Sequence, residues 1–133
     1  MSIYCGTDII EVERIKTAII DTLGFKTRIF TNNEIDIIEK SSDNLIYQRY
    51  AGRFAAKESI YKAFSKILIT NNISLAFNEI EILNDNSLHG RPTINILNND
   101  LNKLILSKNI TVDISISHIK EYAIAMVSVA QEN

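Results

Sequence analysis

Two short segments contain carboxylates and cations whose spacing could support chemistry. In residues 6–15, Asp8 interrupts an apolar run. In residues 53–64, Glu58 is the one acidic residue among several cations on a predicted helix. Two carboxylates from distant parts of a chain, with lysine and arginine close to one of them, are typical of a site where a hard divalent cation holds a phosphorylated ligand.

Each segment also has a purely structural interpretation. Asp8 could cap the helix that follows it, and Glu58 with Lys62, four residues later, could form a surface ion pair contributing only a few tenths of a kcal/mol, roughly. The predicted helix nevertheless has a strong positive excess, because Glu58 is outnumbered by Arg49, Arg53, Lys57, Lys62 and Lys66. A basic helix in an acidic protein indicates an anionic ligand at that place.

Composition limits the class of protein. The chain has 133 residues, of which 46% are hydrophobic, and we expect one domain spanning residues 1–133. A net charge of -2 gives no global case for nucleic-acid binding. No stretch approaches the ~20 apolar residues of a membrane span, so a cytoplasmic protein is expected. The single cysteine, Cys5, lies in an apolar stretch and is expected to be a buried thiol.

Hydrophobic periodicity and turn residues predict an α+β fold with helices mostly early and antiparallel strands mostly late. The predicted elements, in chain order, are a strand over 3–10, helices over 12–23, 31–40 and 45–68, strands over 79–83 and 92–97, a helix over 99–107, and a hairpin over 111–117 and 122–129. Thr31 and Glu34 have the spacing of a capping box. Residues 41–44 break the pattern and can cap the long helix.

The register of the long helix separates its charges. At ~100° per residue, Glu58 and Lys62 form one stripe, whereas Arg53 and Lys57 fall nearer the apolar side. An unpaired buried lysine is costly, so that side is expected to face a partner, a ligand or a wet crevice.

His118 lies at the predicted hairpin turn, where a lone histidine is more often structural or solvated. Ser117 and His118 lack an evident acidic partner, so the pattern does not indicate a hydrolytic triad.

The chain has no G-x-S-x-G elbow, P-loop, G-x-G-x-x-G or C-x-x-C motif. Their absence argues against the enzyme classes that these motifs mark.

Taken together, the motifs closely resemble the holo-acyl-carrier-protein synthases, the small bacterial class of 4′-phosphopantetheinyl transferases. The resemblance covers essentially the whole chain. It depends on G-x-D-I-x-x-x-x-R-I from Gly6, F-T-x-x-E-I from Phe30, R-F-A-A-K-E-S-x-x-K-A-F from Arg53, the segment Gly90-Arg91-Pro92, and S-I-S-H-I-K-E-Y-A from Ser115.

The resemblance implies a transfer of phosphopantetheine from coenzyme A to a serine of apo acyl carrier protein in fatty acid biosynthesis, with release of 3′,5′-ADP. It implies that Asp8 and Glu58 hold Mg²⁺, or Mn²⁺ in its place. Lys62 is expected beside the coenzyme A phosphates, together with Arg53 and His118. The fold implied is a small α+β unit, an antiparallel sheet packed with a long helix, assembled as a homotrimer with active sites between subunits.

The acidic carrier needs a basic docking face. Arg14 begins the helix that docks on the carrier in this family, and Lys16, Lys26 and Arg28 are close to it in sequence.

One departure from the family pattern concerns the segment after Phe64, where the family has a glycine-bearing loop and this chain has no glycine. Glycine permits close backbone approach, so its loss bears on the coenzyme A contacts of that loop and not on the carboxylate pair.

Phosphoryl transfer depends mostly on positioning and charge neutralisation. We expect Lys62 to stabilise charge on the leaving phosphate and Glu58, directly or through water, to be the general base for the carrier serine.

Two alternative functions share part of this residue pattern. Another Mg²⁺-dependent enzyme acting on coenzyme A or a nucleotide diphosphate would need no carrier, and a non-catalytic carrier-binding module would not need Asp8 and Glu58.

Overall fold

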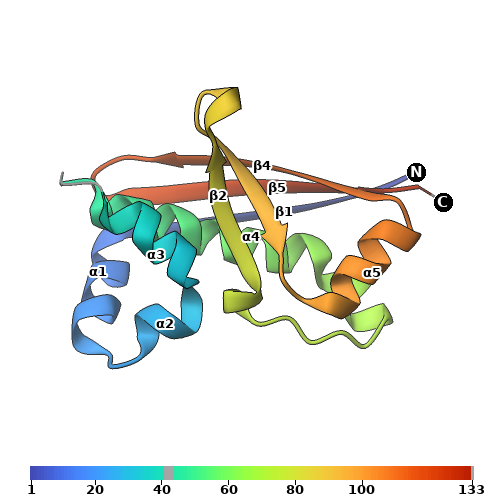
Figure 1. Cartoon of the computed structure of the whole chain (residues 1–133), viewed down its shortest axis with the longest axis horizontal. Coiled ribbons are helices and arrows are strands. Elements are labelled where there is room, and N and C mark those ends of the chain that lie inside the picture. Colours follow the sequence, from blue (N-terminus) through green and yellow to red (C-terminus); the bar gives the residue numbers. More distant parts are fainter. Residues whose placement is uncertain (41–43, 133) are drawn as a thin grey trace.

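The structure is a computed structural model that describes residues 1–40 and 44–132. Its largest sheet has three antiparallel strands in the order β1-β5-β4, formed by Ser2–Glu11, Tyr122–Gln131 and Ile110–His118. Ser2 is the register partner of Gln131, so β1 and β5 bring distant parts of the chain side by side (Figure 1). The predicted strands are confirmed, and β4 and β5 form the expected hairpin.

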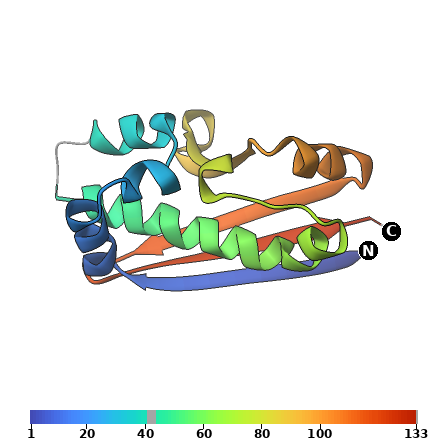
Figure 2. The same cartoon turned by 90° about the horizontal axis from the view of Figure 1, so that it is seen from below.

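Helices and a second sheet cover one face of this sheet, with the long helix α4 lying directly against it (Figure 2). No helix formed by the described residues is long and apolar enough to cross a membrane. The remaining elements are the helices α1 (Val12–Asp21), α2 (Phe25–Ile29), α3 (Asn32–Glu39), α4 (Ile46–Thr70) and α5 (Asn99–Ser107), the strands β2 (Ile80–Asp85) and β3 (Arg91–Ile96), and two 3-10 turns over Phe77–Glu79 and Asn86–Leu88.

The alternation of side chains along β1 decides which residues face α4. Tyr4, Gly6 and Asp8 point to the covered face, and the residues between them point to the open face. Cys5 is therefore exposed, and its expected burial is wrong. The apolar neighbours Ile3 and Tyr4 suggested a buried stretch, but a period of two places adjacent residues on opposite faces of the sheet.

Two glycines let α4 approach the sheet closely. A Cβ atom on Gly6 would lie 1.9 Å from the Ser59 carbonyl oxygen, so β1 and α4 touch through their backbones. At the opposite edge, a Cβ atom on Gly52 would lie 3.0 Å from Cγ2 of Ile116 in β4. The helix consequently crosses the sheet from the β4 edge, near its start, to the β1 edge, near its middle.

A buried ion pair joins α4 to the outer layer. Lys57 and Glu34 are both fully buried, and Lys57 Nζ donates to Glu34 Oε1 at 2.6 Å and to the carbonyl oxygens of Ile29 and Phe77 at 2.6 and 3.1 Å. Glu34 Oε2 accepts from the backbone N–H of Ile82 at 2.9 Å. The charged residue on the apolar side of α4 therefore faces a partner within its own chain rather than a ligand.

Most sequence-predicted boundaries are confirmed, and two details differ. The Thr31–Glu34 capping box is present, whereas the expected break over 41–44 lies largely outside the described residues. The first helix, predicted over 12–23, ends at Asp21, and Leu23 beyond it is fully exposed. Gly24 has a φ of 82° and precedes the helix α2, which the sequence pattern does not predict. The helix α4 ends at Thr70, close to the predicted end at residue 68, so the glycine-free segment after Phe64 is helical.

Lys57→Met should destabilise the fold strongly. The substitution keeps an apolar stem but leaves the Glu34 carboxylate buried without its cation, which costs roughly 3–5 kcal/mol for a buried pair. Arg91→Met is the matched control, because the Arg91–Asp113 pair is 51% and 71% exposed and should contribute at most about 1 kcal/mol. Urea unfolding of both variants measures the difference. Equal and small losses would contradict a structural role for the buried pair.

Candidate functional site

The contact between β1 and α4 brings three predicted site residues together. Asp8 lies on the α4-facing side of β1, with 18% of its side chain exposed. From α4, Lys62 Nζ donates to the carbonyl oxygen of Thr7 at 2.9 Å and lies 3.5 Å from Asp8 Oδ1. Glu58 is one helical turn before Lys62, so the two predicted carboxylates and the predicted lysine form one cluster.

The two carboxylates influence each other electrostatically. Partial burial raises the pKa of Glu58, the negative charge of Asp8 raises it further, and Lys62 opposes both effects. At neutral pH the cluster therefore holds two like charges that a single lysine compensates only in part. A divalent cation between them would remove this repulsion.

The donor chemistry fits a hard cation shared with a ligand. In residues 1–40 and 44–132 there is no group of three or more histidine, cysteine, aspartate or glutamate side chains that could hold a metal. Mg²⁺ commonly takes one or two carboxylates, with water and substrate phosphates completing its shell, and Asp8 with Glu58 matches that mode. Asp8 does not cap the helix that follows it, because Glu11 is at the N-cap position of α1.

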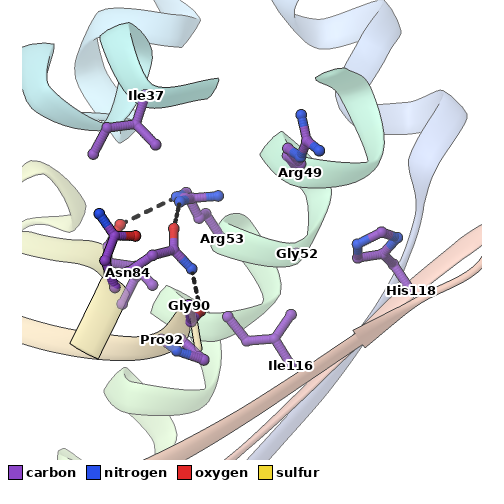
Figure 3. Close-up of a pocket in the computed structure, with 11 residues that line it drawn as sticks. Ile37, Arg49, Gly52, Arg53, Asn84, Gly90, Pro92, Ile116 and His118 are labelled. Atoms are coloured by element: carbon purple, nitrogen blue, oxygen red, sulfur yellow. Dashed lines mark hydrogen bonds between the residues drawn. The ribbon is translucent and has the colours of Figure 1, made fainter. Parts of the chain in front are cut away.

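A cleft of about 500 Å³ lies between α4, the β2–β3 hairpin and the end of β4 (Figure 3). Arg53 extends from α4 into this cleft. This agrees with the prediction that the side of the helix carrying Arg53 faces a partner, a ligand or a wet crevice. Its Nε donates to the carbonyl oxygen of Ile82 at 3.1 Å and its Nη2 to Asn84 Oδ1 at 2.7 Å. Asn84 in turn donates to the carbonyl oxygen of Gly90 at 2.8 Å, which ties the arginine to the hairpin turn.

The cleft is electropositive. Burial lowers the pKa of Arg53, and the negative charge of Glu34 opposes this effect. The positive charge of Arg49, which lines the same cleft, acts in the same direction as burial. An arginine remains protonated at any ordinary pH, so the two guanidinium groups repel each other there. An anion bound between them would relieve that repulsion.

His118 is the last residue of β4 and lines the cleft from the sheet side, with its ring directed toward α4 (Figure 3). Its Nδ1 is 2.7 Å from Oε1 of Gln48 in the first turn of α4. The sequence did not single out Gln48, Asn84 or Asn86 as site residues. The turn composition of residues 84–87 marked the hairpin but not its orientation toward α4, and no sequence signal links Gln48 to a residue 70 positions away.

The predicted site residues fall into two groups within one chain. Arg53 and His118 line the cleft, and of the described residues its lining includes neither Asp8 nor Glu58 nor Lys62. The carboxylate cluster lies at the β1 edge of the sheet and the cleft at the β4 edge, with β5 between them.

The predicted docking cations lie on the first two helices. Arg14 on α1 and Arg28 on α2 are exposed. Lys26 is engaged within the chain, because its Nζ donates to Glu39 at 2.9 Å. Glu39 also accepts the Tyr50 hydroxyl, and the hydrogen bonds from Tyr50 and Lys26 hold the pKa of Glu39 below its usual value. Lys26 is consequently a weaker candidate for docking than Arg14 or Arg28.

Comparison with protein families gives one matching model. Residues 4–127 match the model described as the 4′-phosphopantetheinyl transferase superfamily. A holo-[acyl-carrier-protein] synthase from Fusobacterium nucleatum subsp. nucleatum is 40% identical over 128 residues, which cover 95% of this chain and 97% of that protein.

Solved structures show the same fold. The ACPS–CoA complex from Chronobacterium ammoniagenes superposes with a TM-score of 0.84 at 24% identity, covering 100% of both chains. A holo-(acyl-carrier-protein) synthase from Bacillus anthracis in complex with CoA (3′,5′-ADP) superposes with a TM-score of 0.70 at 30% identity, covering 98% of this chain and 96% of that one.

Proposed function

The chain belongs to the 4′-phosphopantetheinyl transferase superfamily, and on this premise we propose that it is a holo-acyl-carrier-protein synthase. It transfers 4′-phosphopantetheine from coenzyme A to a serine of apo acyl carrier protein and releases 3′,5′-ADP, as fatty acid biosynthesis requires. The observation that carries the proposal is the cluster of Asp8, Glu58 and Lys62, in which two carboxylates from distant segments meet beside an exposed lysine.

Each member of the cluster has a chemical role in this proposal. Asp8 and Glu58 would hold Mg²⁺, or Mn²⁺, which when bound neutralises charge on the coenzyme A diphosphate. Lys62 stabilises charge on the leaving phosphate. Glu58, directly or through water, is the general base that takes the proton of the carrier serine.

The electropositive cleft is the proposed site for the remaining coenzyme A phosphate. Arg53 and His118 supply its hydrogen-bond donors, and an anionic ligand would offset the repulsion between Arg53 and Arg49. Coenzyme A must then contact both the cleft and the carboxylate cluster, which lie at opposite edges of the sheet in one chain.

A homotrimer resolves this separation. In a head-to-tail interface, the β1 edge of one subunit meets the β4 edge of the next, and such interfaces close into rings. The sheet also has an open face that no element within residues 1–40 and 44–132 covers (Figure 2). That face carries large exposed apolar side chains, namely Ile3, Ile9, Tyr122, Ile124 and Met126. Exposed apolar surface of this extent is typical of an interaction face.

The proposed carrier-docking face is formed by α1 and α2. Arg14 and Arg28 are exposed there and can meet an acidic partner despite the net negative charge of the chain. Glu11 and Glu13 lie beside Arg14, so the positive surface is local and its contribution should depend on salt.

Transfer should require both carboxylates. Incubation of the protein with apo carrier, coenzyme A and Mg²⁺ should raise the carrier mass by one phosphopantetheine group, measured by mass spectrometry. Asp8→Ala and Glu58→Gln should each lower the turnover rate by about 100-fold or more. Glu58→Gln should also slightly raise the melting temperature without metal, because a neutral amide is not repelled by Asp8. Near-normal turnover by Glu58→Gln would disprove the carboxylate assignment, and coenzyme A cleavage without carrier would indicate a different enzyme.

Arg14→Glu should weaken carrier binding and spare coenzyme A binding. Among the described residues, those that line the cleft do not include Arg14, and charges at the edge of an interface mainly affect association. We expect the KM for carrier to rise about tenfold and the KM for coenzyme A to stay unchanged, with added salt reducing the difference. Lys108→Glu, a charge reversal at the end of α5, is the control. Equal losses for both substrates would exclude α1 as the docking helix.

The protein should be a trimer in solution. Light scattering coupled to size-exclusion chromatography should give three times the 15.1 kDa mass of one chain. Met126→Glu puts a charge on the open sheet face and should produce monomers that lose transfer activity, because each subunit then has only part of its site. Leu106→Glu, on an exposed position of α5, should remain trimeric. A fully active monomer at micromolar concentration would rule out the shared site.

A further inference from the structure

We propose that Gln48 is a positioning residue that holds the proton of neutral His118 on Nδ1, so that an anion entering the cleft binds together with a proton at Nε2. The inference rests on the proposed function, in which the anion is a phosphate of coenzyme A. It assigns to Gln48 a role in the dependence of ligand affinity on pH.

The geometry joins two rigid elements. Gln48 lies in the first turn of α4 and His118 at the end of β4, where the following turn is closed by a hydrogen bond from Ile119 N–H to the Tyr122 carbonyl oxygen at 2.9 Å. The Gln48 Oε1 to His118 Nδ1 distance is 2.7 Å, which is a short hydrogen bond. Gln48 is half-buried at its position on the helix, so it is a fixed partner for the more exposed ring.

The chemistry of the two atoms determines the tautomer. An amide oxygen can only accept a hydrogen bond, so Nδ1 must be the donor. In a neutral imidazole the other nitrogen, Nε2, then has a lone pair and no proton. Such a ring cannot donate to a phosphate oxygen. The imidazolium can, because it has protons on both nitrogens and keeps the Gln48 bond.

Phosphate binding at Nε2 is therefore coupled to proton uptake. The proton comes from solvent, remains on Nε2 while the anion is bound, and returns to solvent when the anion leaves. The charged groups around the ring favour this coupling only when the anion is present. Arg49 and Arg53 from α4 line the same cleft, the β2–β3 hairpin contributes the uncharged Asn84 and Asn86, and the turn after His118 contains Lys120 and Glu121.

The affinity for coenzyme A should consequently fall as pH rises, because the ring that binds the phosphate carries one proton more than the neutral ring. A neutral His118 could instead give up the Gln48 bond and move its proton to Nε2. The loss of affinity is thus limited to the equivalent of about one hydrogen bond, or roughly tenfold between pH 6 and pH 8.

The first experiment reads the tautomer directly in the protein without ligand. Long-range proton–nitrogen NMR spectra above pH 8 should show His118 protonated on Nδ1. The exposed His89, the other histidine of the chain, is the internal reference. In Gln48→Leu the His118 proton should move to Nε2. A wild-type His118 protonated on Nε2 would overturn the proposal, because Gln48 would then present its amide nitrogen to the ring.

The second experiment measures proton uptake. Calorimetric titration of coenzyme A in two buffers with different ionisation enthalpies gives the number of protons bound at each pH. Gln48→Leu should take up fewer protons than wild type at pH 7.5 and bind more tightly than wild type at pH 8, because its neutral ring can donate from Nε2. Gln48→Glu retains the acceptor and favours the imidazolium, so its affinity should decline at higher pH than that of wild type.

These outcomes distinguish a proton-linked role from a merely structural one. If Gln48 only supported the shape of the cleft, Gln48→Leu would lower affinity equally at every pH, and the proposal would be wrong. The ligand phosphate also titrates near pH 6, but it does so identically in every variant and cancels in the comparison. Absence of coenzyme A binding by a protein with the expected tautomer would overturn the proposed function and leave the Gln48 contact established.

Discussion

The structure depends on one steric constraint, which is the absence of a side chain at Gly6. A β-carbon there would overlap the Ser59 carbonyl oxygen, so no other residue lets β1 lie this close to α4 without a backbone shift. The consequence is chemical as well as structural. Asp8, two residues further along the same face of β1, reaches the helix face that carries Glu58 and Lys62. A wider separation of strand and helix would leave two solvated carboxylates with little influence on each other.

The sequence predicts the secondary structure well where local chemistry decides it. The capping box at Thr31, the alternation in β4 and β5, and the helix over 99–107 are all local signals, and all are confirmed. The errors have a common cause. The predicted burial of Cys5 rests on the apolar character of its neighbours, and the predicted helix over 12–23 rests on apolar spacing. The tertiary structure instead decides which face of a strand is covered and where a helix ends.

The candidate site also combines features that the sequence predicts with features that only the tertiary structure decides. Asp8, Glu58 and Lys62 could be proposed from motifs and are found together, since the motif residues lie on the two elements that touch. The helix register predicts that Arg53 lies on another side of α4 from Glu58 and Lys62. The placement of Arg53 and His118 at the opposite edge of the sheet could not be anticipated, because it follows from the diagonal crossing of α4. The glycine-free segment after Phe64 has a structural explanation as well. Ile67 and Leu68 are buried, so this segment extends the core and does not form a flexible loop.

The position of β5 has a consequence for how the molecule acquires its structure. This strand is central in its sheet, yet it follows every other described element in the chain. Thr7 donates its hydroxyl proton to the Ala125 carbonyl oxygen across 118 positions. Contacts of such long range close slowly, because the loop entropy is lost before the contact is gained. During synthesis β1 and β4 lack their shared neighbour until β5 emerges, so the three-stranded sheet is among the last features of the fold to form.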